Sequence, residues 1–275
     1  DYPPSLLEGF ASEVLISGEV FNNFNRSYNI KFGNGDSYAS LEGVTCFRGN
    51  NYRDSASYGT AAMLEDKLEI MWESKISYID TWSGVGWNGQ PAIVKWPENV
   101  KQIMNLSEEK KNKKDLKEVI YATLDGNIYF LDLDDGKNTR PPINVGSPHK
   151  GSVTVDPRGY PLLYAGQGIP EVAGQPIPIK YRIFNLITQK EIYSINGMDK
   201  DAIRRWGAFD SGALIDAKTD SFLLCGENGL LYSGKLNTVF SPEDKTISIN
   251  PELVKYRYKS PISTKIGVEG SPVIY

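Results

Sequence analysis

Apolar and polar residues alternate along most of the chain in short runs, and these runs recur at a regular spacing. Four six-residue segments align without gaps, at residues 89–94, 151–156, 211–216 and 270–275. Their first residues lie 62, 60 and 59 positions apart, and each segment begins with small residues before its apolar run. Alternation of this kind, rich in Tyr, Ile, Val and Phe, predicts β-strands rather than amphipathic helices.

Three of these segments are each followed by a second, a third and a fourth apolar run. Tight turns such as Asp125-Gly126 and Asn228-Gly229 join the second run to the third. Four strands joined in this way are the unit of a β-propeller blade, so the sequence predicts an all-β fold built from such blades. The first three strands of the blades are predicted at 91–95, 119–124, 128–133, 152–156, 161–165, 181–186, 212–216, 221–225 and 230–235. Fourth strands are predicted at 191–195 and 253–258.

Insertions lengthen the repeat at three places. Residues 96–117 separate the first and second strands of the first blade, and residues 238–251 separate the third and fourth strands of the last one. Residues 167–180 separate the second and third strands of the middle blade. In a propeller these insertions open onto two different faces. The lysines and acidic residues that alternate over 108–118 predict a solvated loop.

Several motifs resemble those of a known family. Residues 131–137 (LDLDDGK) are similar to the signature A-x-D-x-x-T-G-K-x-x-W of pyrroloquinoline-quinone-like (PQQ-like) propellers, and residues 185–193 are a weaker copy. Phe47-Arg48-Gly49-Asn50 with Arg53, followed by residues 69–72, resembles the lead-in of these propellers. Two of the three signature Trp positions are not Trp, and the repeats are longer than is usual in the family. The resemblance covers residues 43–275.

The resemblance implies two units, an N-terminal arm at 1–42 and PQQ-like propeller blades at 43–275. Within the arm, residues 29–40 predict a hairpin that turns at Gly33-Asn34-Gly35. The blade count gives a lone outer strand around Trp72, three complete blades and a lone inner strand at 271–275. Three blades cannot close a ring, since propellers have about four to eight. We therefore expect a parent of seven or eight blades, whose remainder lies in a missing C-terminal segment or in a separate chain.

Composition and charge exclude several function classes. The 34 acidic residues outnumber the 30 basic ones, giving a net charge of −4, which argues against a nucleic-acid-binding surface. No apolar run reaches the length of a membrane span. Cys46 and Cys225 are too few for a cysteine-based zinc site, and a bridge between them is an open alternative. The single histidine, His149, excludes sites that need several.

The candidate binding residues belong to the loops that connect one blade to the next. Asn88, Lys150, Asp210 and Glu269 each precede one of the aligned segments, which predicts a polar ring at the mouth of a central channel. Such a ring could bind a polar ligand, or its members could only cap strand ends and bind water. The neighbouring aromatic residues form either a recognition surface or plugs between blades; they are Trp82, Trp87 and Trp206.

Motifs that carry catalytic or metal chemistry are nearly absent from the sequence. Asp132, Asp134 and Asp135 could contribute to a calcium loop, but the distant bidentate Glu of an EF-hand is missing and an Asp-Gly turn accounts for them. His149 predicts an exposed polar residue rather than a metal ligand or a catalytic base. No catalytic residue and no metal site are assigned.

The resemblance does not by itself establish a function. Quinoprotein dehydrogenases add a catalytic Asp, a calcium site and often adjacent cysteines, none of which matches this sequence, so PQQ is not expected, and calcium is an open alternative that no motif supports. Non-catalytic relatives imply an extracytoplasmic scaffold at a bacterial cell surface that binds a protein or polysaccharide ligand. The alternative is an enzyme, either a quinoprotein-type oxidoreductase or a carbohydrate-active propeller that uses Asp80, Asp210 or Glu269.

Overall fold

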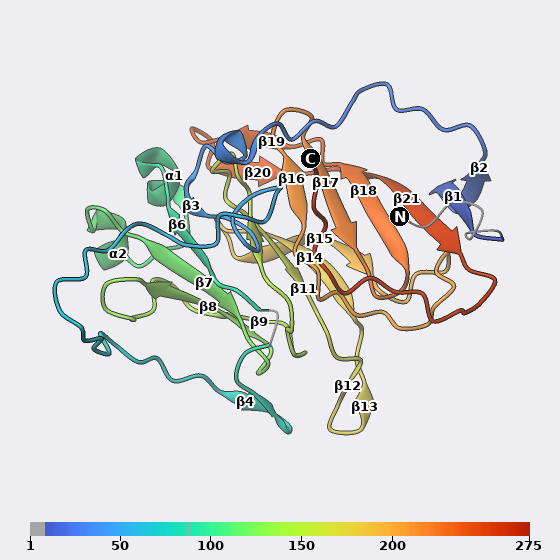
Figure 1. Cartoon of the computed structure of the whole chain (residues 1–275). Coiled ribbons are helices and arrows are strands. Elements are labelled where there is room, and N and C mark those ends of the chain that lie inside the picture. Colours follow the sequence, from blue (N-terminus) through green and yellow to red (C-terminus); the bar gives the residue numbers. More distant parts are fainter. Residues whose placement is uncertain (1–8, 87–88) are drawn as a thin grey trace.

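The computed structural model describes residues 9–86 and 89–275, and its strands form three large antiparallel sheets that follow one another along the chain (Figure 1). We call them blades 1, 2 and 3. Blade 1 contains β3 (Glu42–Val44), β6 (Ala92–Lys95), β7 (Glu118–Ala122), β8 (Asn127–Asp132) and β9 (Ile143–Asn144), in that spatial order. Blade 2 contains β10 (Thr154–Val155), β11 (Leu162–Gly166), β14 (Lys180–Asn185) and β15 (Lys190–Asn196). Blade 3 contains β16 (Leu214–Asp216), β17 (Ser221–Cys225), β18 (Leu230–Lys235) and β21 (Glu252–Lys259), extended by β1 (Ala11–Ile16) and β2 (Glu19–Phe21).

The predicted all-β architecture is confirmed strand by strand. Each strand predicted for the three complete blades overlaps an observed one, and the two predicted fourth strands are β15 and β21. Gly126 and Gly229 have φ angles of +80° and +83°, the left-handed conformation that a tight hairpin turn requires. The alternating pattern therefore located the strands correctly, because a half-buried strand must show a period of two residues.

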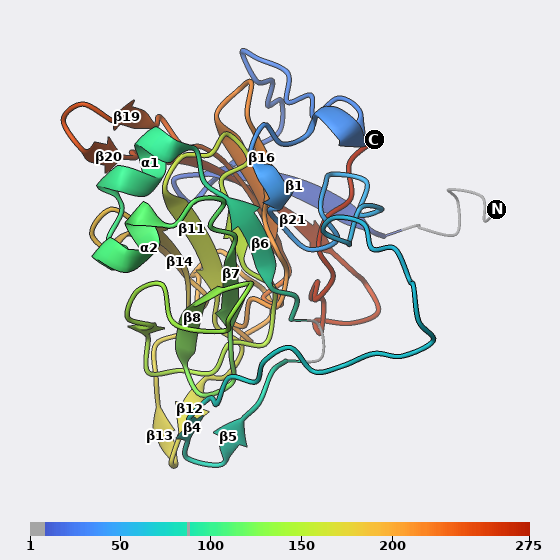
Figure 2. The same cartoon turned by 90° about the vertical axis from the view of Figure 1, so that its left-hand side faces the viewer.

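The insertions separate the two ends of the sheets (Figures 1 and 2). One end, which we call the insertion face, carries α1 (Glu98–Ile103), α2 (Glu108–Asn112) and the hairpin of β19 (Val239–Ser241) and β20 (Thr246–Ser248). The opposite end, the connection face, carries the hairpin of β4 (Tyr78–Ile79) and β5 (Trp82–Ser83) and that of β12 (Glu171–Val172) and β13 (Gln175–Pro176). The expectation of a solvated loop over 108–118 was wrong for Lys110, which is 3% exposed because α2 packs it against the Asp132 turn.

The blades pack face to face through two apolar cores. Alternate residues of β11 serve different cores: Leu163 packs with blade 1, and Tyr164 packs with blade 3. All five residues of β11 are buried as a result. A strand covered on both faces needs apolar residues at nearly every position, which is the reason for its almost continuous apolar sequence.

Residues 38–46 cross the inner strands of all three blades. Gly43 pairs with Val94 of β6, the Thr45 carbonyl accepts a hydrogen bond from Val155 N at 2.7 Å, and the Tyr38 hydroxyl accepts one from Ile215 N at 3.1 Å. This segment therefore ties the three sheets together at their inner edges.

The predicted hairpin over 29–40 is not observed. Its expected turn is instead the start of one turn of 3-10 helix, η2 (Gly35–Ser37), which is capped by the Asn34 side chain accepting from Ser37 N. Phe32 and Tyr38 are buried against blade 3 and so do not pair with each other in a ladder. The N-terminal hairpin lies earlier in the chain and is formed by β1 and β2. The division into units 1–42 and 43–275 stays a prediction.

The two predicted lone strands are also wrong as strands, although both segments dock on blades. Trp72 donates from Nε1 to the Leu133 carbonyl at 2.8 Å, and its ring lies against Gly136 of the turn after β8, but no described strand pairs with its backbone. Residues 271–275 form single hydrogen bonds to loop residues instead of a ladder, as when Ile274 N donates to the Asn51 carbonyl at 3.0 Å. Within residues 9–86 and 89–275 the blades do not close into a ring.

Candidate functional site

One hydrogen bond recurs between consecutive blades on the connection face. The connection that leaves each blade donates a backbone N–H to the turn between that blade's second and third strands. The three examples are His149 N to Thr123 O at 3.1 Å, Phe209 N to Gln167 O at 2.9 Å and Val268 N to Gly226 O at 3.2 Å. The residue after each donor is Lys150, Asp210 or Glu269. The fold therefore gives these three predicted residues equivalent positions.

The starts of the inner strands approach one another at backbone distance. A Cβ added to Gly151 would lie 2.2 Å from the Asp210 carbonyl oxygen, and one added to Gly86 would lie 2.0 Å from the Lys150 carbonyl oxygen. Only glycine fits at such approaches, which explains the glycine that opens the aligned segment at 151–156. A Cβ on Gly168 would meet both the Lys150 stem, at 2.7 Å, and Asp210 Oδ1, at 2.9 Å. Lys150 and Asp210 thus lie together against the blade 2 turn.

Glu227 is the central residue of this region, and the sequence did not single it out. Its backbone N–H donates to the Ala208 carbonyl at 3.0 Å, which fixes the turn between β17 and β18 against the connection that precedes blade 3. The residue is 3% exposed, and its Oε2 lies 3.9 Å from Arg204 Nη1. Its other oxygen, Oε1, is buried and accepts no hydrogen bond from any described residue.

The electrostatic environment of Glu227 moves the titration of its carboxyl group toward neutral pH. Burial raises its pKa to about 7, helped by the negative charges of Asp210 and Glu269 and opposed by the positive charges of Lys150 and Arg204. Five charged groups therefore influence one another here, and we call them the Glu227 cluster: Lys150, Arg204, Asp210, Glu227 and Glu269.

The repeat contains the signal that would have identified Glu227. In each blade the second residue of the turn after the second strand donates its N–H to that blade's own preceding connection. The equivalent residues are Leu124, Gly168 and Glu227, bonded to the carbonyls of Gly84, Pro148 and Ala208. Only blade 3 has an ionisable side chain at this position, so aligning the turns as well as the strands would have selected it.

The predicted aromatic residues lie on the same face but differ in exposure. Trp82 is half-buried in β5, where it pairs with Ile79, and Trp206 is 36% exposed. Tyr78, at the start of β4, is 75% exposed. The β4–β5 and β12–β13 hairpins lie side by side (Figure 2), and Ala173 N donates to Asp80 Oδ2 at 3.2 Å across them. Two further predicted residues, Trp87 and Asn88, lie outside the described residues.

His149 is buried, which corrects the expectation of an exposed polar residue. Its side chain is 0% exposed because the connection between blades 1 and 2 is covered by both turns. Burial lowers the pKa of the imidazole to about 4, so it is neutral at pH 7. Nδ1 lies 2.6 Å from the Gly166 carbonyl, a contact that requires the proton on Nδ1. We assign His149 a structural role between the two blades.

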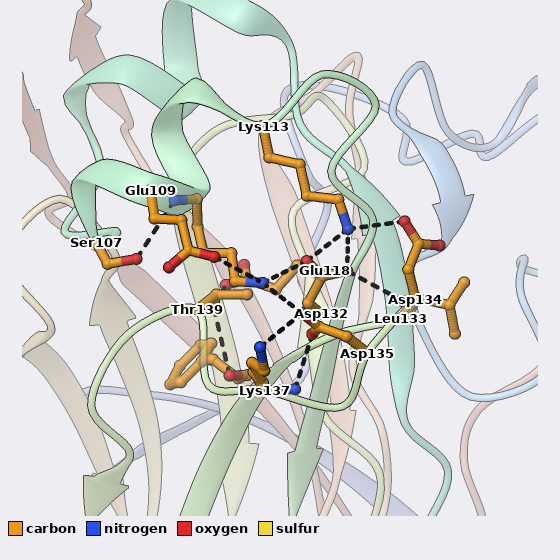
Figure 3. Close-up of polar contacts among 12 residues, drawn as sticks. Ser107, Glu109, Lys113, Glu118, Asp132, Leu133, Asp134, Asp135, Lys137 and Thr139 are labelled. Carbon is orange, nitrogen blue, oxygen red and sulfur yellow. Dashed lines mark hydrogen bonds and ion pairs between the residues drawn. The ribbon is translucent and has the colours of Figure 1, made fainter. Parts of the chain in front are cut away.

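The Asp132 turn lies away from this site and is neutralised by lysines. Lys110 Nζ and Lys113 Nζ each lie 2.7 Å from Asp132, and Lys113 also lies 2.7 Å from Asp134. Figure 3 shows Lys113 directed at both carboxylates. In the described parts of the chain, no group of three or more His, Cys, Asp or Glu residues could hold a metal ion. Cys46 and Cys225 are both buried as free thiols.

Comparisons with known proteins give no family assignment. No family model and no curated protein matches the chain, and no described helix is long and apolar enough to cross a membrane. Among solved structures, a europium-containing methanol dehydrogenase is similar at 12% identity and a TM-score of 0.29, over 52% of this chain and 35% of that one. This chain thus spans about a third of that protein's length.

A second solved structure is the β-propeller domain of Cps50 (Swd1) from Myceliophteria thermophila. It is 10% identical, with a TM-score of 0.25, over 72% of this chain and 76% of that one. Likenesses at such TM-scores carry no argument about this chain. Its all-β architecture of four-stranded blades rests on its own sheets and repeated contacts, and membership of the PQQ-like family stays a prediction.

Proposed function

We propose that this chain is a non-enzymatic binding module that recognises a protein or polysaccharide ligand through the connection face, with the Glu227 cluster at the centre of the contact. Buried Glu227 Oε1, which has no hydrogen bond from a described residue, is the observation that carries the proposal. A buried polar atom without a partner destabilises a fold by about 1–3 kcal/mol. Such an atom is therefore a candidate for a hydrogen bond that a ligand completes.

The surroundings of Glu227 suit a ligand rich in hydroxyl or amide groups. The cluster offers carboxylate acceptors and the cationic donors of Lys150 and Arg204 within one small region. Exposed Tyr78 and half-buried Trp82 supply apolar rings with polar tips elsewhere on the connection face. Aromatic rings beside a few convergent polar groups are the usual composition of a recognition site. The extracytoplasmic location at a bacterial cell surface belongs to the same proposal.

We further propose that the chain does not bind PQQ. The cofactor carries three carboxylates, whereas the Glu227 cluster already sets three acidic residues against two cations. Placing a further trianion there would add like-charge repulsion. Titration with PQQ and calcium, followed by absorbance, is expected to give no saturable change.

Affinity electrophoresis through gels containing soluble polysaccharides, together with a glycan microarray, tests the binding function. We expect at least one polysaccharide to retard the wild-type chain and the Glu227→Gln and Tyr78→Ala variants to be retarded less. Glu243→Gln removes the same charge from an exposed position in the β19–β20 turn of the insertion face and is the matched control. Retardation that all four proteins share would place the contact elsewhere and contradict the proposal.

A second candidate function is favoured by the raised pKa of Glu227. Glycoside hydrolases use two carboxyl groups whose surroundings push their pKa values apart, one as proton donor and one as nucleophile or base. Protonated Glu227 beside Asp210 or Glu269 matches the first part of that description. Asp80 does not belong to this group, since its carboxylate accepts from Ala173 in the hairpin contact. Release of reducing ends from a bound polysaccharide, abolished by Glu227→Gln, would replace binding with hydrolysis as the conclusion.

A further inference from the structure

A pocket lies beside the outer strands of blade 3, away from the connection-face site. It has a volume of about 310 Å³ and is bounded by the β18–β21 ladder, the end of β1 and residues 24–28. Its apolar lining includes Ile16, Phe24 and Leu253, and its polar lining includes Arg26, Tyr28 and Lys235. A pocket of this size accommodates a small organic molecule.

Two positive charges converge on one ring in this pocket. The Lys235 ammonium lies 5.2 Å from the centroid of the Tyr28 ring, and the Arg26 guanidinium carbon lies 5.8 Å from the same centroid. Arg26 also lies 5.5 Å from the Phe24 ring centroid. All four side chains are half-buried. The residues are far apart in sequence, so the fold alone brings the two cations together.

Neither cation has an ion-pair partner among residues 9–86 and 89–275. Within the described parts of the chain, Arg26 donates only to the hydroxyls of Tyr28 and Tyr256, at 3.4 Å each, which leaves most of its donor capacity unused. Glu252 is the ladder partner of Lys235, yet its Oε1 accepts from Asn237 Nδ2 at 2.9 Å, and the Lys235 ammonium is directed at the Tyr28 ring instead.

We propose that this pocket binds a small organic anion, a carboxylate or a phosphate monoester carried on an apolar body. Each cation approaches the Tyr28 ring and has no ion-pair partner among the described residues, so an anion in the pocket would gain charge-assisted hydrogen bonds from one or both of them. The planar guanidinium suits the two oxygens of either anionic group. Phe24, Ile16 and Leu253 then contact the apolar body. Glu252, which also lines the pocket, favours ligands with a single anionic group.

Isothermal titration at low salt, with benzoate and phenyl phosphate as probes and benzyl alcohol as the neutral analogue, tests this assignment. We expect saturable binding of one or both anions and none of the alcohol. Arg26→Gln and Lys235→Gln should each weaken binding about tenfold or more, as expected for loss of one charged contact. Competition by inorganic phosphate would show that the anionic group supplies most of the affinity, in agreement with the proposal.

Two further variants make the test independent of folding losses. Lys190→Gln removes one exposed positive charge from β15 of blade 2 and should leave the affinity unchanged. Glu252→Gln removes the acidic wall of the pocket and should tighten anion binding. The wild-type affinity should also fall as salt rises, because salt screens exposed charge pairs. Three results would each overturn the proposal. They are equal affinities of wild type, Arg26→Gln and Lys235→Gln, binding of benzyl alcohol, and no saturable binding of either anion up to about 10 mM.

Discussion

Asp132, at the end of β8 in blade 1, and Glu227, in the β17–β18 turn of blade 3, are both buried carboxylates, but their surroundings differ. Asp132 is 0% exposed and receives Lys110 and Lys113 at 2.7 Å each, together with the Asp134 N–H at 3.0 Å. Although burial acts to raise the pKa of Asp132, these hydrogen bonds lower it overall. Glu227 Oε2 lies 3.9 Å from Arg204 Nη1, and burial with the negative charges of Asp210 and Glu269 raises its pKa against the positive charges of Lys150 and Arg204.

The same contrast extends to the rest of blade 1. Glu118 is fully buried, yet it accepts from Arg140 Nη2 at 2.7 Å and from Trp96 Nε1 at 2.8 Å, and the Thr139 hydroxyl also donates to it. Both carboxylate oxygens of Glu118 thus accept hydrogen bonds within the fold, so its charge serves stability. The Glu227 cluster leaves an acceptor unsatisfied, so its charge can serve a ligand. Burial is therefore common to the Glu118 and Glu227 carboxylates, and what differs between them is the completeness of their hydrogen bonds.

The largest effect on stability is expected from breaking the buried Glu118–Arg140 ion pair. Arg140→Met leaves Glu118 buried without its cation, which should lower the free energy of unfolding by about 3–5 kcal/mol. Denaturant titration measures this loss. Lys67→Met, which breaks the exposed Lys67–Glu69 pair, is the control and should change the free energy by less than about 0.5 kcal/mol. A loss of unfolding free energy in Arg140→Met no larger than in Lys67→Met would mean that the Glu118–Arg140 pair does not stabilise the fold.

The next effect concerns His149, the buried group that the connection face keeps neutral. Its folded pKa of about 4 lies below the unfolded value of 6.5, so the unfolded state binds a proton first as the pH falls. Stability should therefore be full above pH 6.5 and fall by about 2–3 kcal/mol between pH 6.5 and 4. Because the chain has one histidine, its imidazole resonances report the pKa directly by NMR. A titration midpoint near 6.5 would show that the side chain reaches solvent.

Glu227 should show the opposite pH dependence. Its folded pKa of about 7 lies above the unfolded value of 4.5, so the burden of burying its charge is absent below pH 4.5 and complete above pH 7. Glu227→Gln should thus stabilise the chain relative to wild type by about 1–2 kcal/mol at pH 8 and by little at pH 4.5. Thermal and denaturant unfolding at the two pH values measure the difference. A stabilisation that is the same at both would remove the electrostatic explanation.

The smallest effect on stability is expected on the β4–β5 hairpin of the connection face. Tyr78 is 75% exposed, so Tyr78→Ala should change the free energy of unfolding by no more than about 0.5 kcal/mol. Trp82→Ala removes a half-buried ring and should cost somewhat more. Calorimetric midpoints measure both. Unfolding of the chain on loss of Tyr78 would show that the hairpin is part of the core and not a recognition element.

The positions of the strands were predictable, and the states of the charged side chains were not. Leu162–Gly166 could be assigned to a strand from a short apolar run and a following turn, both of which act within a few residues. Lys110 and His149 were expected in solvent because each stands among polar neighbours in sequence, yet both are buried by segments about 20 residues away. The hairpin expected at 29–40 failed for a related reason, because Phe32 and Tyr38 gain more by packing on blade 3 than by pairing.

The sequence by itself determined the antiparallel blades, their turns and the equivalent positions of Lys150, Asp210 and Glu269, because strand period and repeat spacing are properties of the chain alone. Only the tertiary structure decided which charges are satisfied. Arg204 and Glu227 meet across a connection and a turn, and Arg26 and Lys235 both approach the Tyr28 ring. Electrostatic energy depends on burial and on distance through space, and neither quantity is written in the order of the residues.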